Sequence, residues 1–210
     1  MLKVLIADDH AVVRQGLKNI LLNEDSKALF GEAESGADVM ELAGKQKWDI
    51  VIMDISMPGR NGLEVLKDMK RDYKELPVLV LSAHPEDQYA IRALRSGASG
   101  YITKASAPDE LVKAIQKIIS GETYISSDLA RQIPLYLNPE VQQAPHERLS
   151  DREYQVLCMM ASGKTVKQIS VELSLSVKSI STYRTRILEK TGMKTNAELI
   201  HYAIEHKLVQ

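Results

Sequence analysis

The stretch Val51-Ile52-Met53-Asp54-Ile55-Ser56-Met57-Pro58-Gly59 decides the fold that we predict for this chain. It is a short apolar run that ends on one carboxylate and is followed at once by turn residues, a pattern typical of a buried parallel strand. Asp54 would then lie at the carboxyl end of that strand, where open α/β sheets bind their ligands. A carboxylate in this position is a candidate nucleophile, metal ligand or both.

The residues on either side of this stretch repeat the pattern of strand followed by helix. Strands are predicted at residues 2–7, 28–33, 48–53, 77–81 and 100–103, and helices at 10–22, 37–46, 63–71, 86–95 and 108–119. Strands that alternate with helices in this way form a doubly wound parallel sheet. We therefore predict an α/β domain with a five-stranded sheet over residues 1–121.

The remainder of the chain has a different character. Residues 122–148 lose the periodicity and contain prolines and glutamines, which predicts a linker with a short helix near residues 127–137. Residues 149–210 predict a small all-α domain, with a capping box at Ser150–Glu153 and a second at Thr165–Gln168. A short helix to residue 173, a turn, a longer helix at 177–190 and a last helix at 196–207 form a helix-turn-helix candidate.

Composition limits the class of protein. An apolar fraction of 44% and a charged fraction of 26% are ordinary for a globular protein, and no apolar run reaches the roughly 18 residues of a membrane span. The N-terminus lacks a signal-peptide pattern, so we expect a cytoplasmic protein without membrane contact. The single cysteine, Cys158, excludes a disulfide framework and a cysteine-based zinc site.

The formal charge of −1 is unevenly distributed. Residues 149–210 carry nine Lys and Arg against six Asp and Glu, a net charge of +3, whereas the rest of the chain carries 18 against 22, a net charge of −4. A basic module behind an acidic one points to nucleic acid, although +3 alone is weak evidence.

Polar groups follow four of the predicted strands: Asp8 and Asp9, Asp54, Ser82, and Lys104. In a doubly wound sheet these strand ends meet at one edge, where three carboxylates would repel one another unless a hard cation such as Mg²⁺ lay among them. A lysine and a hydroxyl there suit an incoming phosphoryl group, so the set favours phosphoryl transfer onto Asp54. The alternative is that each is an ordinary surface residue at a strand end.

These residues carry a resemblance. Asp8-Asp9, Met53-Asp54-Ile55-Ser56-Met57-Pro58 with Gly62, Ser82-Ala83 and Tyr101-Ile102-Thr103-Lys104 resemble a bacterial response-regulator receiver domain. Leu149-Ser150-Asp151-Arg152-Glu153 and Val177-Lys178-Ser179-Ile180-Ser181-Thr182-Tyr183-Arg184 resemble the LuxR-type helix-turn-helix. Together they are similar to the NarL/FixJ family, and the resemblance leaves only the linker unmatched. It implies a flavodoxin-like receiver followed by a DNA-binding domain.

The resemblance also implies roles for individual residues. Asp54 would be the phosphoacceptor, with Mg²⁺ held by Asp9, Asp54 and the carbonyl of Ser56, and by Asp8 directly or through water. Lys104 would pair with the phosphoryl group, Ser82 would move toward it, and Tyr101 would turn inward, although plain strand packing remains an alternative for Tyr101. A phosphoryl group adds roughly −1.5 to −2 charges, enough to bias a bistable loop.

Two departures from the family pattern bear on these roles. Many receivers have a cis proline after the lysine, but this chain has Ala105, which leaves the geometry of that loop open. Relatives usually carry asparagine where this chain has Val166, which puts one phosphate contact in doubt.

The longer helix of the second domain has two faces. Ile180, Tyr183, Ile187 and Thr191 form the predicted buried stripe. On the opposite face, Lys178, Ser181, Thr182 and Thr185 suit base edges in the major groove of double-stranded DNA. The expected phosphate contacts, which position the protein without specifying sequence, are Arg184, Arg186, Lys164 and Lys167. An ordinary solvated helix face is the alternative.

The favoured hypothesis is a transcriptional regulator in which a sensor histidine kinase phosphorylates Asp54 and thereby controls DNA binding. Its own chemistry would be limited to gaining and losing that phosphoryl group. Two half-sites favour a homodimer in the phosphorylated form, paired in the family through the last helix, and RNA polymerase is a further expected partner. The alternative, a Mg²⁺-dependent phosphohydrolase with an aspartyl-phosphate intermediate, usually needs a second aspartate where Ser56 stands.

Overall fold

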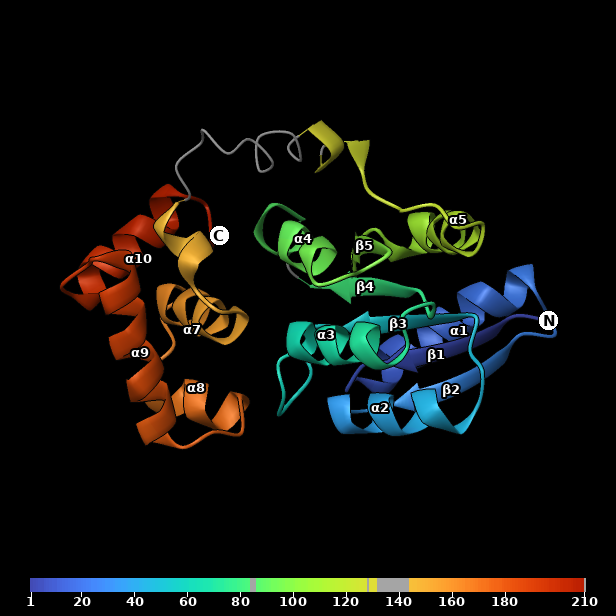
Figure 1. The fold of residues 1–210 in the computed structure, drawn as a ribbon, viewed down its shortest axis with the longest axis horizontal. Coiled ribbons are helices and arrows are strands. Elements are labelled where there is room, and N and C mark those ends of the chain that lie inside the picture. The colour runs from blue at the N-terminus through green and yellow to red at the C-terminus, as the bar shows by residue number, and fades with distance from the viewer. Residues whose placement is uncertain (84–85, 128, 132–143, 210) are drawn as a thin grey trace. The chain divides into compact units, whose positions relative to one another are not determined.

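The computed structural model describes residues 1–83, 86–127, 129–131 and 144–209, and for residues 87 and 88 the backbone alone. The chain divides into two compact units, Met1–Pro134 and Leu135–Gln210, which are described separately below (Figure 1). The predicted domain boundaries after residues 121 and 148 stay predictions. Of the predicted short helix, residues 127 and 129–131 are helical, and its remainder lies outside the described residues, as do residues 138–143 of the predicted linker.

The first unit alternates strands with helices, as predicted. Its strands are β1 (Lys3–Ala7), β2 (Leu29–Ala33), β3 (Ile50–Asp54), β4 (Val78–Ser82) and β5 (Gly100–Thr103). Its helices are α1 (Ala11–Glu24), α2 (Gly36–Lys45), α3 (Gly62–Asp72), α4 (Glu86–Arg95) and α5 (Ala107–Ile119). β3 begins at Ile50, later than predicted, and Trp48 precedes it with its indole N–H donating to the carbonyl oxygen of Leu42 at 2.9 Å.

The five strands form one parallel sheet in the order β2-β1-β3-β4-β5. The chain passes from β1 outward to β2 and then returns to the other side of β1, so the order reverses between β1 and β3. Ligands of doubly wound sheets bind at the carboxyl ends of the strands beside such a reversal. Asp8 directly follows β1 and Asp54 ends β3, so the predicted site residues stand at this point.

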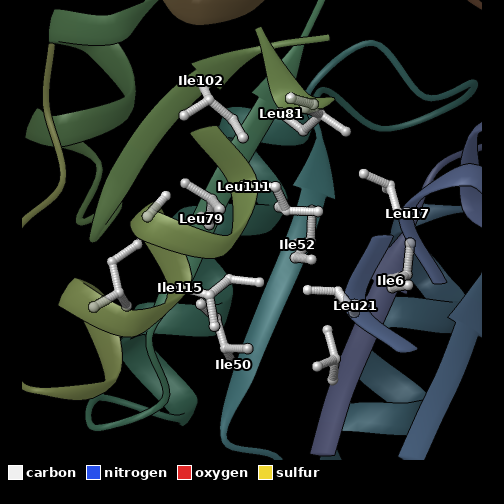
Figure 2. Close-up of a cluster of buried hydrophobic side chains, with 14 residues drawn as sticks. Ile6, Leu17, Leu21, Ile50, Ile52, Leu79, Leu81, Ile102, Leu111 and Ile115 are labelled. Atoms are coloured by element: carbon white, nitrogen blue, oxygen red, sulfur yellow. The ribbon is translucent and has the colours of Figure 1, made fainter. Parts of the chain in front are cut away.

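Both faces of the sheet are covered, which explains the nearly continuous apolar strands. One face packs against α1 and α5 through a buried cluster shown in Figure 2, where Leu17 and Leu21 of α1 and Leu111 and Ile115 of α5 meet side chains of the strands. The helices α2, α3 and α4 contribute their own buried side chains to the core, including Val39, Leu66 and Ala90. This packing holds the strand ends, and with them the polar residues, in a defined register.

The second unit is helical. It contains the 3₁₀ turn η1 (Pro145–Arg148) and the helices α7 (Asp151–Ala161), α8 (Val166–Glu172), α9 (Val177–Thr191) and α10 (Asn196–Glu205). Both predicted capping boxes are present: Ser150 and Thr165 accept from backbone N–H groups at the third helical position, and the side chains of Glu153 and Gln168 return the bond. Ser176 and Thr195 cap α9 and α10 with one bond each, accepting from the N–H groups of Ser179 and Glu198. The caps satisfy helix N–H groups that would otherwise lack partners.

A tight turn joins α8 to α9. Leu175 N donates to Ser170 O at 2.9 Å, and Ser174 adopts a left-handed conformation with φ of 52°. The buried carboxylate of Glu153 bonds to the Lys190 ammonium at 2.6 Å, which joins α7 to α9. Burial raises the pKa of Glu153, but the bonds from Lys190 and from Ser150 outweigh it and leave that pKa below its ordinary value. The short helix, turn and longer helix of the predicted helix-turn-helix are therefore confirmed.

No helix in the described part of the chain combines the length and the apolar character needed to cross a bilayer.

Candidate functional site

The strand ends bring together the polar residues that the sequence singled out. The register aligns Ala7 with Met53, Asp54 with Leu81, and Ser82 with Thr103, so the residues after β1, β3, β4 and β5 share one edge. The Nζ atom of Lys104 lies 2.7 Å from Asp54 Oδ2 and 2.7 Å from Asp8 Oδ2. One ammonium thus joins two carboxylates that come from different strands.

Asp54 is a buried carboxylate, with 1% of its surface exposed. Its Oδ1 atom accepts from the N–H of Ser56 at 2.8 Å, and its Oδ2 atom accepts from Lys104. Burial raises the pKa of Asp54, and this effect outweighs the lowering by Lys104 and by the Ser56 N–H. The surroundings of Asp54 as a whole therefore disfavour its ionised form, and the Lys104 ammonium offsets only part of the effect of burial.

The loop that follows Asp54 is closed by a near approach of backbone to backbone. A Cβ atom at Gly62 would lie 2.4 Å from the Cα atom of Ile55, so this position requires glycine. Asn61 caps α3 by accepting from Leu63 N at 2.8 Å. Ser56, on the same loop, has an exposed side chain, and the role of its carbonyl oxygen stays a prediction.

Lys104 is held in place by its backbone. Its N–H donates to Ser82 O at 2.7 Å, and the Lys104–Ala105 peptide is trans, since no cis peptide bond occurs among the described residues. The open question about Ala105 is thereby answered, because the side chain reaches both carboxylates without a cis bond. Burial lowers the pKa of Lys104, but its bonds to Asp54 and Asp8 outweigh this, so that the pKa is raised and the group is an ammonium at neutral pH.

Asp8 and Asp9 form the acidic side of the site together with His10. Asp8 is buried, with 0% exposed, and its Oδ1 atom accepts from His10 N at 2.9 Å. The His10 Nδ1 atom lies 2.9 Å from Asp9 Oδ1 and 3.2 Å from Asp8 Oδ1. The His10 side chain is 67% exposed, so its ring contacts the two aspartates from the solvent side.

The donor set fits a hard divalent cation. Ligand atoms of Asp8, Asp9 and His10 lie within 4.8 Å of one another, and Asp54 lies across Lys104 from Asp8. Asp8 Oδ2 is buried and makes no well-aligned hydrogen bond, although the Lys104 ammonium stands 2.7 Å away as an ion-pair partner. A buried carboxylate oxygen with spare acceptor capacity, near further carboxylates, suits Mg²⁺.

Ser82 and Tyr101 lie beside this site on adjacent strands. Ser82 is buried at the end of β4, and Tyr101 pairs with Val80 in the sheet. The ring of Tyr101 is buried, with 0% exposed, which is the inward position that the resemblance assigns to the phosphorylated form. The movement of the Ser82 and Tyr101 side chains on phosphorylation stays a prediction.

In the second unit, α9 presents the predicted polar face. Ile180 and Ile187 are buried, whereas Lys178, Ser181, Thr182, Thr185 and Arg186 are exposed. The hydroxyl groups of Ser181, Thr182 and Thr185 donate to the carbonyl oxygens four residues earlier, at 2.9, 3.0 and 3.2 Å. Their oxygen lone pairs therefore face outward as acceptors.

Two of the predicted phosphate contacts already have partners within the unit. The Nζ atom of Lys164 lies 2.7 and 2.6 Å from the two carboxylate oxygens of Glu172, and Arg184 Nε donates to Asn196 Oδ1 at 2.5 Å. Lys167 and Arg186 are exposed. A phosphate would have to compete with Glu172 for Lys164, and the contact of Lys164 with phosphate stays a prediction.

Comparison with known proteins agrees with this geometry. A family model described as the response regulator receiver domain matches residues 4–116, and one described as bacterial regulatory proteins of the luxR family matches residues 147–203. The chain belongs to the NarL/FixJ family of response regulators. Its two units are a receiver domain and a LuxR-type DNA-binding domain, and the family is one of transcription regulators.

The similarity extends over the whole response regulator. Response regulator UvrY of Escherichia coli is 38% identical over 209 residues, 99% of this chain and 96% of its own length. Response regulator GacA of Pseudomonas aeruginosa is 38% identical over 210 residues, 100% of this chain and 98% of its own length. A structure of RcsB from Salmonella enterica serovar Typhimurium, bound to the promoter rprA with a phosphomimetic beryllofluoride, has a TM-score of 0.65 and 27% identity, and covers 96% of this chain and 98% of that one.

The contact between Lys104 and Asp54 leads to a prediction about the pKa of Asp54. We expect Lys104→Met to raise the pKa of Asp54 further, because burial remains while the ammonium that favours the carboxylate is lost. Carbon-13 NMR titration of the side-chain carboxyl groups measures this shift, with Lys113→Met, an exposed lysine of α5, as the matched control. An Asp54 pKa that stays the same or falls in Lys104→Met would contradict our description of the site.

Proposed function

We propose that Asp54 is the phosphoacceptor of this response regulator and that its phosphorylation by a sensor histidine kinase controls DNA binding. The observation that carries the proposal is the Lys104 ammonium, 2.7 Å from both Asp54 and Asp8 at the carboxyl edge of the sheet. Asp54 combines a carboxylate nucleophile with an adjacent positive charge that suits phosphoryl oxygens.

The transfer forms one bond and breaks another. A carboxylate oxygen of Asp54 forms a bond to phosphorus, and the bond between phosphorus and the imidazole nitrogen of the kinase's phosphohistidine breaks, with the electron pair leaving on the imidazole. The group on Asp54 is then an acyl phosphate, and the Lys104 ammonium exchanges its carboxylate partner for a phosphoryl oxygen. Ser82 donates its hydroxyl hydrogen to another of these oxygens.

The ion would be held by Asp8, Asp9, Asp54 and the carbonyl oxygen of Ser56. When bound, Mg²⁺ supplies positive charge to the phosphoryl oxygens as negative charge builds up on them. The chain's own residues do the rest: Ser56 N–H orients Asp54, and the backbone bond from Lys104 to Ser82 keeps the lysine on the same side of the sheet. The alternative, a phosphohydrolase, calls for an aspartate where the exposed Ser56 stands.

The proposed output is sequence-specific binding of double-stranded DNA by α9. Lys178, Ser181, Thr182 and Thr185 would face base edges in the major groove, because they line the exposed side of its N-terminal half. Contacts to phosphates would come from Arg186 and Lys167, and from Arg184 and Lys164 after they release their partners. Solved structures of the relative RcsB are of complexes with promoter DNA, and one is of two RcsB dimers on two DNAs.

The same reasoning extends to assembly and location. A homodimer that forms on phosphorylation would place two copies of α9 on two half-sites, with α10 around residues 197–203 as the pairing surface. RNA polymerase is the proposed partner on bound promoters, and the cytoplasm the proposed compartment. The proposed domain limits are 1–121 for the receiver, 122–148 for the linker and 149–210 for the DNA-binding domain.

DNA binding with and without a phosphoryl mimic tests the proposal. We expect beryllofluoride with Mg²⁺ to strengthen binding of the wild type to its DNA sites by about 5- to 150-fold, the usual range of allosteric coupling, and to leave Asp54→Ala unchanged. Binding of genomic fragments at stated salt concentrations measures this, because protein–DNA affinity depends steeply on salt. Asp72→Ala, an exposed aspartate of α3, is the control and should respond like the wild type.

Equal DNA affinity in all samples, with the mimic bound, would contradict phosphorylation as the control of DNA binding. An increase in the DNA affinity of Asp54→Ala when the mimic is added would show that the phosphoacceptor is another residue.

A further inference from the structure

Arg14 is a charged side chain buried beneath the acidic site. It lies on α1, and 6% of its surface is exposed. Its guanidinium group contacts three oxygens: Nη1 donates to Asp8 O at 2.7 Å, Nε to Glu32 Oε2 at 2.9 Å, and Nη2 to Glu34 Oε1 at 2.6 Å. The pKa of Arg14 is raised, above all by its bond to Glu32.

The bond to Asp8 O completes a set that fixes Asp8. The Asp8 N–H donates to Ala33 O at 3.1 Å, and its Oδ1 atom accepts from His10 N at 2.9 Å. The carboxylates of Glu32 and Glu34 balance the charges of Arg14 and Lys18, so the guanidinium does not add net positive charge beside the site. Its influence on Asp8 and Asp9 is therefore geometric: it fixes the peptide that joins them.

We propose that Arg14 is a positioning residue for the divalent ion, because it fixes the Asp8–Asp9 peptide so that both carboxylates face one ligand. The inference rests on the proposed function for the identity of that ion. Groups that orient metal ligands without touching the metal typically change affinity by about 10–100-fold when removed.

Mg²⁺ affinity of the full-length protein tests this role. We expect Arg14→Met to weaken Mg²⁺ binding about tenfold, and Arg14→Lys to restore part of it, since lysine keeps one donor for the carbonyl. The matched control is Lys18→Met: Lys18 also binds Glu32, at 2.6 Å, and should leave the affinity within about twofold of the wild type, because the ligand peptide is untouched. Titration of backbone amide NMR signals around Asp9 and Ser56 gives the dissociation constants.

A milder variant tests the same role in case Arg14→Met does not fold. Glu34→Gln keeps the buried arginine and weakens one of its anchors, and we expect an intermediate loss of Mg²⁺ affinity. Wild-type affinity in both Arg14→Met and Glu34→Gln would overturn the inference and leave the metal site standing. A wild type that binds no Mg²⁺ would overturn the proposed metal site as well.

A second, independent observation concerns the chain that leaves α5. Tyr124 returns to the edge of the sheet and pairs in parallel with Gly100 at the start of β5. Tyr124 N donates to Ser99 O at 2.9 Å, and Tyr101 N donates to Tyr124 O at 3.3 Å. A Cβ atom at Gly100 would lie 2.9 Å from Tyr124 O, so this approach depends on glycine.

The next residues attach the same segment to α4. Ser126 accepts from Leu129 N at 3.1 Å, and its hydroxyl group bonds to the carboxylate of Glu86, the first residue of α4. Leu129 is buried, with 1% exposed. The beginning of the predicted linker is thus bound to both β5 and α4, the elements that follow Ser82 in the chain (the yellow-green segment beyond α5 in Figure 1).

We infer that residues 123–127 and 129–131 transmit the state of the phosphorylation site to the rest of the linker. Tyr101, proposed to respond to phospho-Asp54, bonds through its own N–H to Tyr124, so a shift of β5 displaces this segment directly. Ser126 adds a second bond, to Glu86 of α4, so a shift of α4 would also displace this segment. The inference rests on the proposed function, because it needs the mimic to change β5 or α4.

Hydrogen exchange of the full-length protein tests the transmission. We expect beryllofluoride with Mg²⁺ to change the exchange rates of the Tyr124 and Leu129 amides by about threefold or more, as local opening free energies shift. Ser126→Ala should bind the mimic normally but lose about threefold or more of the mimic-dependent gain in DNA affinity, a typical effect for a coupling residue. Ser127→Ala, exposed on the same segment, is the matched control and should behave like the wild type.

Exchange at Tyr124 and Leu129 that does not respond, while amides around Asp54 do, would overturn this second inference and leave the switch intact. A wild-type DNA response in Ser126→Ala would overturn it as well. A mimic that changes no amide in the receiver would overturn the proposed function along with it.

Discussion

The structure of the receiver depends on one ammonium between two buried carboxylates. Lys104 lies 2.7 Å from both Asp8 and Asp54, and these carboxylates have 0% and 1% of their surface exposed. Buried charges are costly unless they are paired. Here two negative charges share one positive charge, so the pair is incompletely neutralised. That imbalance is the physical reason for our proposal that a cation, and with it a phosphoryl group, binds at this site.

This contact exists because of the sheet register. Asp8 and Lys104 follow β1 and β5, with β3 and β4 between them in the sheet. The bond from Lys104 N to Ser82 O holds the backbone of Lys104 against the end of β4, from which its side chain reaches Asp54 and Asp8. A slip of one residue in any strand would turn its end residue to the other face. The apolar cluster between the sheet, α1 and α5 opposes such a slip, because buried side chains of β1, β3, β4 and β5 would lose their packing against the two helices. The core therefore serves the site by fixing register.

The sequence predicted what depends on local pattern and missed what depends on long-range partners. Apolar runs predicted the strands, the polar residues at their ends predicted the site, and Ser150 and Thr165 predicted helix starts, since capping is a local property. Hydrophobic periodicity does not indicate which distant charged residue pairs with a given side chain, so the bonds of Arg14 to Glu32 and Glu34 could not be predicted. Lys164 was assigned to phosphate because helical periodicity does not predict its pairing with Glu172 either, which joins the loop before α8 to the last residue of that helix. Residues 122–131 lack periodicity, yet Tyr124 and Ser126 are held by β5 and α4.

The most direct test of the central claim is to locate the phosphoryl group itself. The full-length protein would be phosphorylated by its kinase or by acetyl phosphate, the acyl phosphate trapped by borohydride reduction, and the modified residue identified by mass spectrometry of peptides. Our account predicts modification at Asp54 alone, dependent on Mg²⁺ and strongly reduced in Lys104→Met. Modification at Asp8 or Asp9 in place of Asp54, or none in a folded protein that binds Mg²⁺, would contradict it.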